Sequence, residues 1–147
     1  MVAVALAAIA GALGHGVSAP VPPGWHLVAQ QVEASACDPV ERLALATYRL
    51  PPASREITRI PRGQALVIVL EDHVNPRSSY HSKPRRIPIA WRRASRFEGC
   101  CGLPTAPGWE FFFRSRGRDL VVLVHVGPDL APRRRTQIPR ILAGIDG

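Results

Sequence analysis

The spacing of hydrophobic residues along this chain of 147 residues changes near its C-terminus. It is typical of β-strands up to about residue 126 and of an α-helix after that. The segment Ala65–Leu70 is apolar without interruption, which predicts a central strand that is covered on both faces. Trp109–Phe113 and Leu120–Val126 flank a polar stretch that contains a glycine, and this pattern predicts a β-hairpin. Apolar residues near the C-terminus recur at helical spacing, so we expect an amphipathic helix that begins near Thr136 and has Pro139 in its first turn.

Weaker patterns predict three short strands and an early helix. Gly24–Ala29, Thr47–Leu50 and Ile87–Ala94 have the composition of strands, and Pro88 confines the last of them to an edge of the sheet. Asp38-Pro39-Val40-Glu41 matches a helix start, because aspartate accepts backbone N–H bonds, proline fits the first helical position and glutamate closes a capping box. Together these elements predict an α+β fold, in which a mostly antiparallel sheet with a short early helix packs against the C-terminal amphipathic helix.

The first 23 residues differ from the rest of the chain. Val2–Leu13 is apolar and uncharged, and glycines and a proline-rich run follow it, which is typical of a secretory signal and its processing zone. Val17-Ser18-Ala19 and Ala12-Leu13-Gly14 both fit a cleavage site, and retention as a membrane anchor is a third alternative. We therefore expect residues 1–23 to be a signal peptide or N-terminal anchor with a proline-rich linker. Residues 24–147 are expected to form a single domain that is secreted or anchored outside the cytoplasm.

Three cysteines, Cys37, Cys100 and Cys101, bear on the same question of location. In an exported domain an odd number of cysteines predicts one disulfide and one spare thiol. The expected bridge joins Cys37 to either of the two adjacent cysteines, and the choice between them stays open. Such a bridge contributes roughly 2–4 kcal/mol by closing a long loop. A thiol–imidazole pair with His125 is the alternative use of Cys100 or Cys101.

Positive charge is concentrated in the middle of the chain. The formal net charge is +8, and the segment from Asp72 to Arg96 contains seven cationic residues and a single acid. Guanidinium groups bind phosphate through two parallel hydrogen bonds, and a tryptophan can stack on a ring or lie at a lipid headgroup. We therefore expect a site for an anionic envelope polymer or for lipid headgroups. The alternative is a solvated, arginine-rich edge strand that resists aggregation. The residues of this candidate anion-binding site are Arg85, Arg86, Trp91, Arg92 and Arg93.

Enzymatic chemistry has weaker support in the sequence. There is no cofactor motif, no metal-ligand spacing and no nucleophile elbow, so we expect neither a cofactor nor a metal. An extracytoplasmic enzyme with a site at His73 and His81, near the loop from Asp72 to Arg86, is the first alternative function. A nucleic-acid-binding protein is the second, and it requires a cytosolic chain.

Five segments resemble small, uncharacterised exported proteins of actinobacteria with GC-rich genomes: GWHLV, DPVERLALATYRL, RGQALVIVLED, GWEFFFRSRGRDLVVLVHVGPD and RILAGID. The resemblance extends over most of residues 24–147. The order of the elements is also similar to that of the PsbP-like α+β fold, whose members mostly act as accessory or scaffold proteins. The resemblance implies a non-enzymatic binding or accessory module, and it supplies no catalytic residues.

Overall fold

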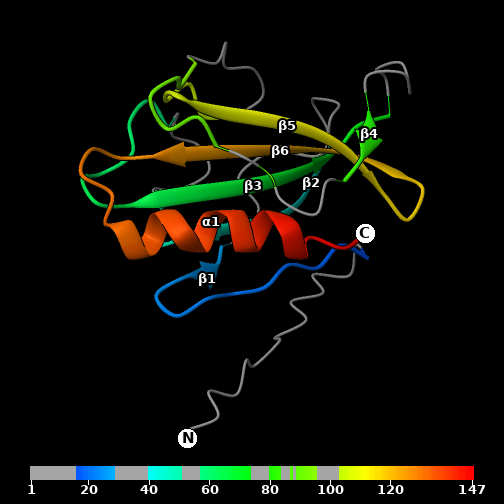
Figure 1. Ribbon diagram of the computed structural model, residues 1–147, viewed down its shortest axis with the longest axis horizontal. Coiled ribbons are helices and arrows are strands. Elements are labelled where there is room, and N and C mark those ends of the chain that lie inside the picture. The colour runs from blue at the N-terminus through cyan, green and yellow to red at the C-terminus, as the bar shows by residue number, and fades with distance from the viewer. Residues whose placement is uncertain are drawn as a thin grey trace, which may run out of the picture.

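The computed structural model describes residues 16–28, 40–50, 57–73, 80–83, 87, 89–95 and 103–147. Six strands in these ranges form one sheet in the order β1-β2-β3-β6-β5-β4, and neighbouring strands are antiparallel except for β4 and β5. The strands are β1 (His26–Leu27), β2 (Val40–Ala46), β3 (Ala65–Glu71), β4 (His81–Ser82), β5 (Gly108–Ser115) and β6 (Arg118–Val126). In the described ranges one helix, α1 (Pro132–Gly144), packs along the sheet (Figure 1). The predicted α+β class, with a mostly antiparallel sheet and a C-terminal helix, is confirmed.

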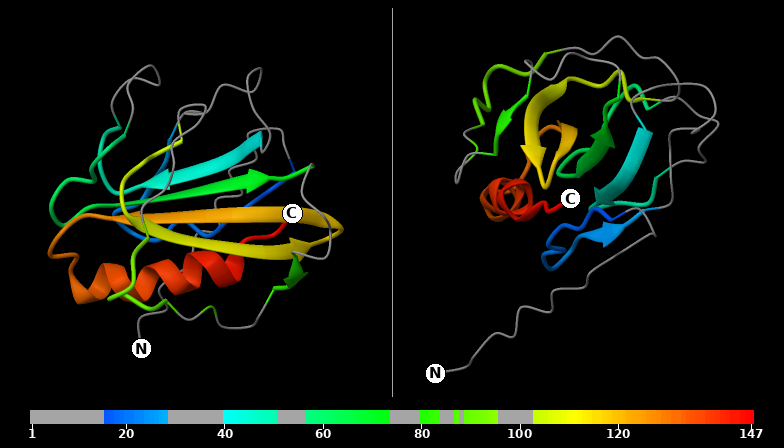
Figure 2. Two further views of the ribbon diagram at one scale, coloured as in Figure 1. Left: turned by 90° about the horizontal axis from the view of Figure 1, so that it is seen from above. Right: turned by 90° about the vertical axis from the view of Figure 1, so that its right-hand side faces the viewer.

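Strand β3 forms the middle of the core, as its uninterrupted apolar sequence predicted. All seven of its residues are buried. Val67 lies on the α1 side of the sheet, in the same cluster as Ile138. Ile68 lies on the opposite side, where Ile57 and Ala106 from two connecting segments cover the sheet. Figure 2 shows α1 on one side of the strands. Because both faces are covered, β3 has no polar face, and the prediction of a central strand is confirmed.

The predicted β-hairpin is also confirmed, and its strands are longer than expected. Pairing between β5 and β6 continues through Arg114 and Asp119, which the sequence had placed in the loop. The turn consists of Arg116 and Gly117, whose φ angles are 47° and 81°. Two central residues with positive φ are characteristic of the tight turn whose twist matches that of antiparallel strands.

Helix α1 begins earlier than the sequence predicted. Its first residue is Pro132, and a missing N–H costs nothing at that position because the first helical N–H groups have no partner within the helix. Pro139 consequently lies inside the helix, where it deprives the carbonyl of Arg135 of its usual donor. The helix forms nevertheless, because Ile138 and Ile141 of its predicted apolar stripe are fully buried against the sheet.

The predicted early helix is wrong where the structure describes the chain. Val40–Ala46 is strand β2, while residues 38–39 lie outside the described ranges. Alternate residues of β2 serve both sides of the core, with Leu43 on the α1 side and Ala44 on the opposite side. A capping box acts only on the first turn of a helix, whereas pairing with β3 and the burial of five of the seven residues stabilise the strand, so tertiary packing outweighs the local signal.

Two of the predicted short strands do not form in the described chain. Thr47–Leu50 bends away after β2, and only its first backbone N–H continues the ladder, donating to the carbonyl of Ala65 at 3.1 Å. Within the predicted edge strand, residues 91–92 form a turn, and Trp91 packs there against Trp109. The chain turns here because the turn brings the Trp91 ring against Trp109, whereas the sequence pattern predicted an extended strand.

Described residues before β2 run along the edge of the sheet. The strand predicted within Gly24–Ala29 is confirmed as β1, which pairs with β2. The described chain before it, which the sequence assigned to a signal peptide or anchor and its proline-rich linker, contacts the domain: Val17 and Ala19 are buried in the core. Ser18 forms an isolated bridge with Asp146, so the two ends of the described chain lie side by side.

Several sequence predictions fall outside the described residues. They are the apolar part of the leader, the three cysteines and two members of the candidate anion site, namely residues 1–15, Cys37, Cys100, Cys101, Arg85 and Arg86. Across the part of the chain that is described, none of the helices is long and apolar enough to span a bilayer. The prediction of a leader and that of a disulfide therefore stay predictions.

Candidate anion-binding site

A hollow of about 690 Å³ lies at one end of the sheet, where β5 begins and β6 ends. Connecting segments rather than strands supply most of its walls, so its shape depends on how these segments pack at the end of the sheet. We call this hollow the tryptophan groove. It is lined by residues 58–60, Trp91, Ala94, residues 105–107, Trp109 and residues 126–128.

Two tryptophans form one wall of the groove. The rings of Trp91 and Trp109 meet edge to face, with centroids 5.3 Å apart and an interplanar angle of 74°. Trp109 is only 9% exposed, and its indole N–H donates to the carbonyl of Ala90 at 3.0 Å. This bond ties the turn that carries Trp91 to β5. Edge-to-face packing and the hydrogen bond together hold the half-buried Trp91 ring in a fixed orientation toward the groove.

Arginines surround this aromatic wall. The guanidinium of Arg135 lies 5.8 Å from the centroid of the Trp91 ring, within the range of a cation–π contact. Arg92 and Arg93 are exposed in the turn that follows Trp91, and Arg59 is an exposed residue of the groove lining. Among the described residues, no ion pair involves Arg92 or Arg93. Within the described part of the chain, therefore, no ion pair neutralises the positive charge of these two arginines.

A buried histidine supports the back of the groove. His125 of β6 is fully buried, and its Nδ1–H donates to the carbonyl of Ala106, 2.9 Å away. Burial lowers the pKa of His125 to about 4, although the carbonyls of Ala106 and Pro107 oppose that shift. The imidazole is therefore neutral near pH 7 and positions the 105–107 wall, adding no charge to the site.

Close backbone approach fixes the chain beside the groove at two glycines. A Cβ atom added to Gly127 would lie 1.8 Å from the carbonyl oxygen of Pro61. A Cβ atom added to Gly108 would lie 2.3 Å from the carbonyl oxygen of Val124. Only glycine fits at these two points, so the segments that enclose the groove pack directly on the backbone at the end of the sheet.

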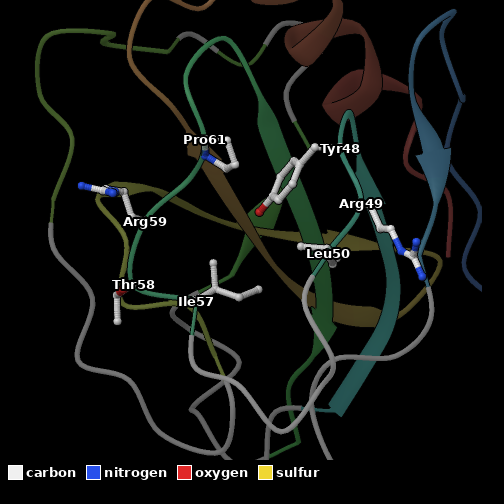
Figure 3. A pocket seen from close by; sticks show the side chains of 7 residues that line it. All are labelled: Tyr48, Arg49, Leu50, Ile57, Thr58, Arg59 and Pro61. Atoms are coloured by element: carbon white, nitrogen blue, oxygen red, sulfur yellow. The ribbon is translucent and has the colours of Figure 1, made fainter.

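A second, smaller hollow of about 370 Å³ adjoins the groove and shares Thr58 and Arg59 with it (Figure 3). Its lining includes Tyr48, whose hydroxyl is buried without a hydrogen-bond partner among the described residues. Burial raises the pKa of Tyr48 to about 12, so the phenol stays protonated. In Figure 3 the guanidinium groups of Arg49 and Arg59 point away from the centre of the hollow. The smaller hollow is therefore the poorer candidate for an anion.

The structure describes three of the five residues predicted for the anion site: Trp91, Arg92 and Arg93. Trp91 lines the tryptophan groove directly, and the two arginines follow in the same exposed turn. The sequence did not identify Trp109 and Arg135, which reach the site from β5 and α1. A usable signal was the run of three arginines in the first turn of a helix, where positive charge opposes the helix dipole.

The alternative enzyme site is only partly described. Asp72 is buried and accepts a hydrogen bond from the hydroxyl of Tyr80. His73 and His81 are exposed, and residues 74–79 and 84–86 of the intervening loop lie outside the described ranges. Across the described residues, no group of three histidine, cysteine or acidic side chains is placed to hold a metal ion.

Comparisons of this chain with protein-family models, with curated proteins and with solved structures find no match. The functional argument therefore rests on the geometry and the charge of the tryptophan groove.

Proposed function

We propose that the protein is a non-enzymatic binding or accessory module outside the cytoplasm, and that its tryptophan groove binds a phosphate-bearing polymer of the cell envelope. The observation that carries this proposal is the arrangement of exposed arginines, without described acidic partners, around a fixed tryptophan ring. A guanidinium donates two parallel hydrogen bonds to a phosphate. The ring supplies an apolar surface for the part of the ligand between its charges.

The recessed position of the tryptophans favours a polymer over a lipid surface. A protein that enters a membrane interface presents large apolar side chains outward. Trp109 is almost fully buried, and Trp91 lies in the wall of a groove. Among the described large apolar residues, the exposed one is Phe112, which packs on Tyr80 away from the groove. A groove of this kind accepts a chain, whereas a flat bilayer would meet the arginines without reaching the rings.

A binding measurement with poly(glycerol phosphate) tests the proposal. The double variant Arg92→Gln/Arg93→Gln should lower the affinity at low salt by at least about tenfold, because each arginine removed takes away a charge-assisted contact. The matched control Arg49→Gln/Arg140→Gln removes the same charge from two exposed arginines outside the groove and should change the affinity by less than about twofold. Equal losses in both double variants would contradict a localised site.

Vesicles that contain phosphatidylglycerol provide the second arm of this experiment, since their headgroup carries the same glycerol phosphate chemistry on a bilayer. We expect the polymer to bind with clear dependence on Trp91 and the vesicles to bind only weakly. Vesicle binding that is tighter than polymer binding would assign the groove to a membrane surface. Polymer binding that does not weaken between low and high salt would show that the arginines are not the contact.

A further inference from the structure

The first described residues form a short strap that ties the beginning of the chain to its end. We call residues 16–20 the N-terminal strap. The backbone N–H of Ser18 donates to the carbonyl of Asp146 at 2.7 Å, and the N–H of Asp146 donates back to the carbonyl of Ser18 at 2.9 Å. This reciprocal pair is the same unit that joins two antiparallel strands, so the strap is paired like a strand.

Side chains of the N-terminal strap are part of the core. Val17 is 2% exposed and Ala19 is 8% exposed, and both belong to the cluster on the α1 side of the sheet. Pro20 lies against Gly144, where an added Cβ atom would be 2.2 Å from the proline Cγ. A domain without these residues would have an empty apolar slot beside α1 and two unpaired backbone groups at Asp146.

The N-terminal strap and the tryptophan groove lie at opposite ends of α1. Asp146 follows the last turn of the helix, whereas Arg135 in the first turn covers the ring of Trp91. A helix of 13 residues is about 20 Å long. Figure 1 shows the same separation, with the blue start of the described chain beside the C-terminus and the orange start of α1 on the other side of the picture.

We infer that the N-terminal strap is a permanent part of the mature protein, and that it holds any segment before residue 16 at the end of the domain opposite the tryptophan groove. Of the two cleavage sites that fit the sequence, the one after Ala19 would remove Val17 and Ala19 from the core and Ser18 from its bridge with Asp146. The mature chain therefore keeps these residues. If the residues before the strap anchor the protein to a membrane, the tryptophan groove faces away from that membrane. This orientation matters only if the proposed function holds, whereas retention of the strap is independent of it.

The intact mass of the native protein, measured separately in membrane, medium and cytosol fractions, tests retention. In every fraction that contains the protein, we expect the mass of a chain that includes Val17. A mature chain that begins at Pro20 would overturn the inference.

Two substitutions at one position test whether the strap supports the fold. Ser18→Pro removes the N–H that donates to Asp146, whereas the control Ser18→Ala keeps the backbone unchanged. We expect Ser18→Pro to lower Tm by roughly 5–10 °C relative to Ser18→Ala. Equal melting temperatures for the two variants would show that the strap is dispensable.

Coupling the protein by an N-terminal tag to neutral vesicles tests the orientation. Poly(glycerol phosphate) should bind to the coupled and the free protein with affinities within about twofold of each other, since the groove faces away from the vesicle. Binding that is lost only on coupling would overturn the orientation. If the free protein does not bind the polymer, the proposed function fails, and the mass and Tm results still decide whether the strap is retained.

Discussion

The two ends of the sheet use arginine in opposite ways. At the ion-pair end, defined by Glu71, Asp119 and the arginines that contact them, Arg42 lies 2.7 Å from Glu71 and Arg114 lies 2.7 Å from Asp119. Arg118 is a second partner of Glu71 at 3.4 Å. Both carboxylates are only 11% exposed. At the tryptophan groove, by contrast, exposed arginines face solvent around an aromatic wall.

The contrast separates two roles of one residue type. A half-buried arginine that faces a buried carboxylate completes a network, and its removal leaves an uncompensated charge. An exposed arginine without a nearby acid contributes little to folding, since water and salt screen it, and it remains available to a ligand. We therefore expect substitutions at the ion-pair end to change stability and substitutions at the groove to change binding.

The largest expected effect is on stability at the ion-pair end. Glu71→Gln leaves the guanidiniums of Arg42 and Arg118 without their buried carboxylate and should cost about 3 kcal/mol in the free energy of unfolding. Urea unfolding measures this cost. The folded fraction of the variant should still bind poly(glycerol phosphate) as the natural sequence does. If Glu71→Gln has normal stability, or if it loses binding while it stays folded, the proposed division into a stabilising end and a binding end would be wrong.

Acid should weaken the fold through the histidine behind the groove. His125 has an ordinary pKa near 6.5 when unfolded and a pKa of about 4 in the fold, so the fold disfavours its charged form. The stability that comes from neutral His125 is complete above pH 6.5 and is lost as pH falls from 6.5 through 4. Between pH 7 and pH 4.5 this loss amounts to about 2–3 kcal/mol.

Unfolding of His125→Asn at the same two pH values supplies the control for this prediction. The carboxylates titrate in both proteins, so the difference between the two pH responses isolates the histidine. We expect the natural sequence to lose about 2 kcal/mol more than the variant. Parallel pH responses would mean that His125 is not held neutral by burial.

A moderate effect is expected on affinity at the aromatic wall. Trp91→Ala removes the ring on which the ligand packs and should weaken the binding of poly(glycerol phosphate) by about tenfold, with a small change in Tm. Phe112→Ala is the matched control, because it removes another aromatic ring, 39% exposed and outside the groove. Similar affinities for the two variants would indicate that the arginines alone bind the polymer.

The smallest effect is expected at an exposed ion pair that adjoins the groove. Arg62 and Asp129 pair with side chains that are 80% and 64% exposed. Asp129→Asn should change the free energy of unfolding by less than about 0.5 kcal/mol. Removal of a negative charge near Pro128 of the groove should raise the affinity for the polymer at low salt by up to about twofold. A larger stability loss would show that exposed pairs here resemble those of the ion-pair end.

The sequence predicted those parts of the fold in which one periodic pattern decides the structure. Continuous apolar residues identified β3, and two apolar segments around a glycine turn identified the hairpin of β5 and β6. The prediction failed at β2, because the local capping signal stood in a segment that pairs with β3 and packs into the core on both sides of the sheet. It also missed the first turn of α1, since a helix that packs well on a sheet tolerates Pro139.

The candidate site could be predicted only in part, for a related reason. Trp91, Arg92 and Arg93 are adjacent in the chain, so their charge and aromatic character are visible as one cluster. Trp109 and Arg135 reach the same place because β5 begins and α1 starts at the same end of the sheet. No pattern in the sequence predicts that these two residues lie close to Trp91. Clusters within one turn are thus visible in a sequence, whereas sites assembled from several elements require the fold.

The three tryptophans provide the most direct test of the central claim that the groove binds the polymer. Trp91 and Trp109 line the groove, whereas Trp25 is buried outside it and donates its indole N–H to Gln137 at 2.9 Å. We would follow the indole signals of the ¹⁵N-labelled protein by NMR during a titration with poly(glycerol phosphate). The account predicts that the signals of Trp91 and Trp109 shift in a saturable manner while that of Trp25 stays in place. A titration in which the two groove signals do not move, or move no more than that of Trp25, would contradict it.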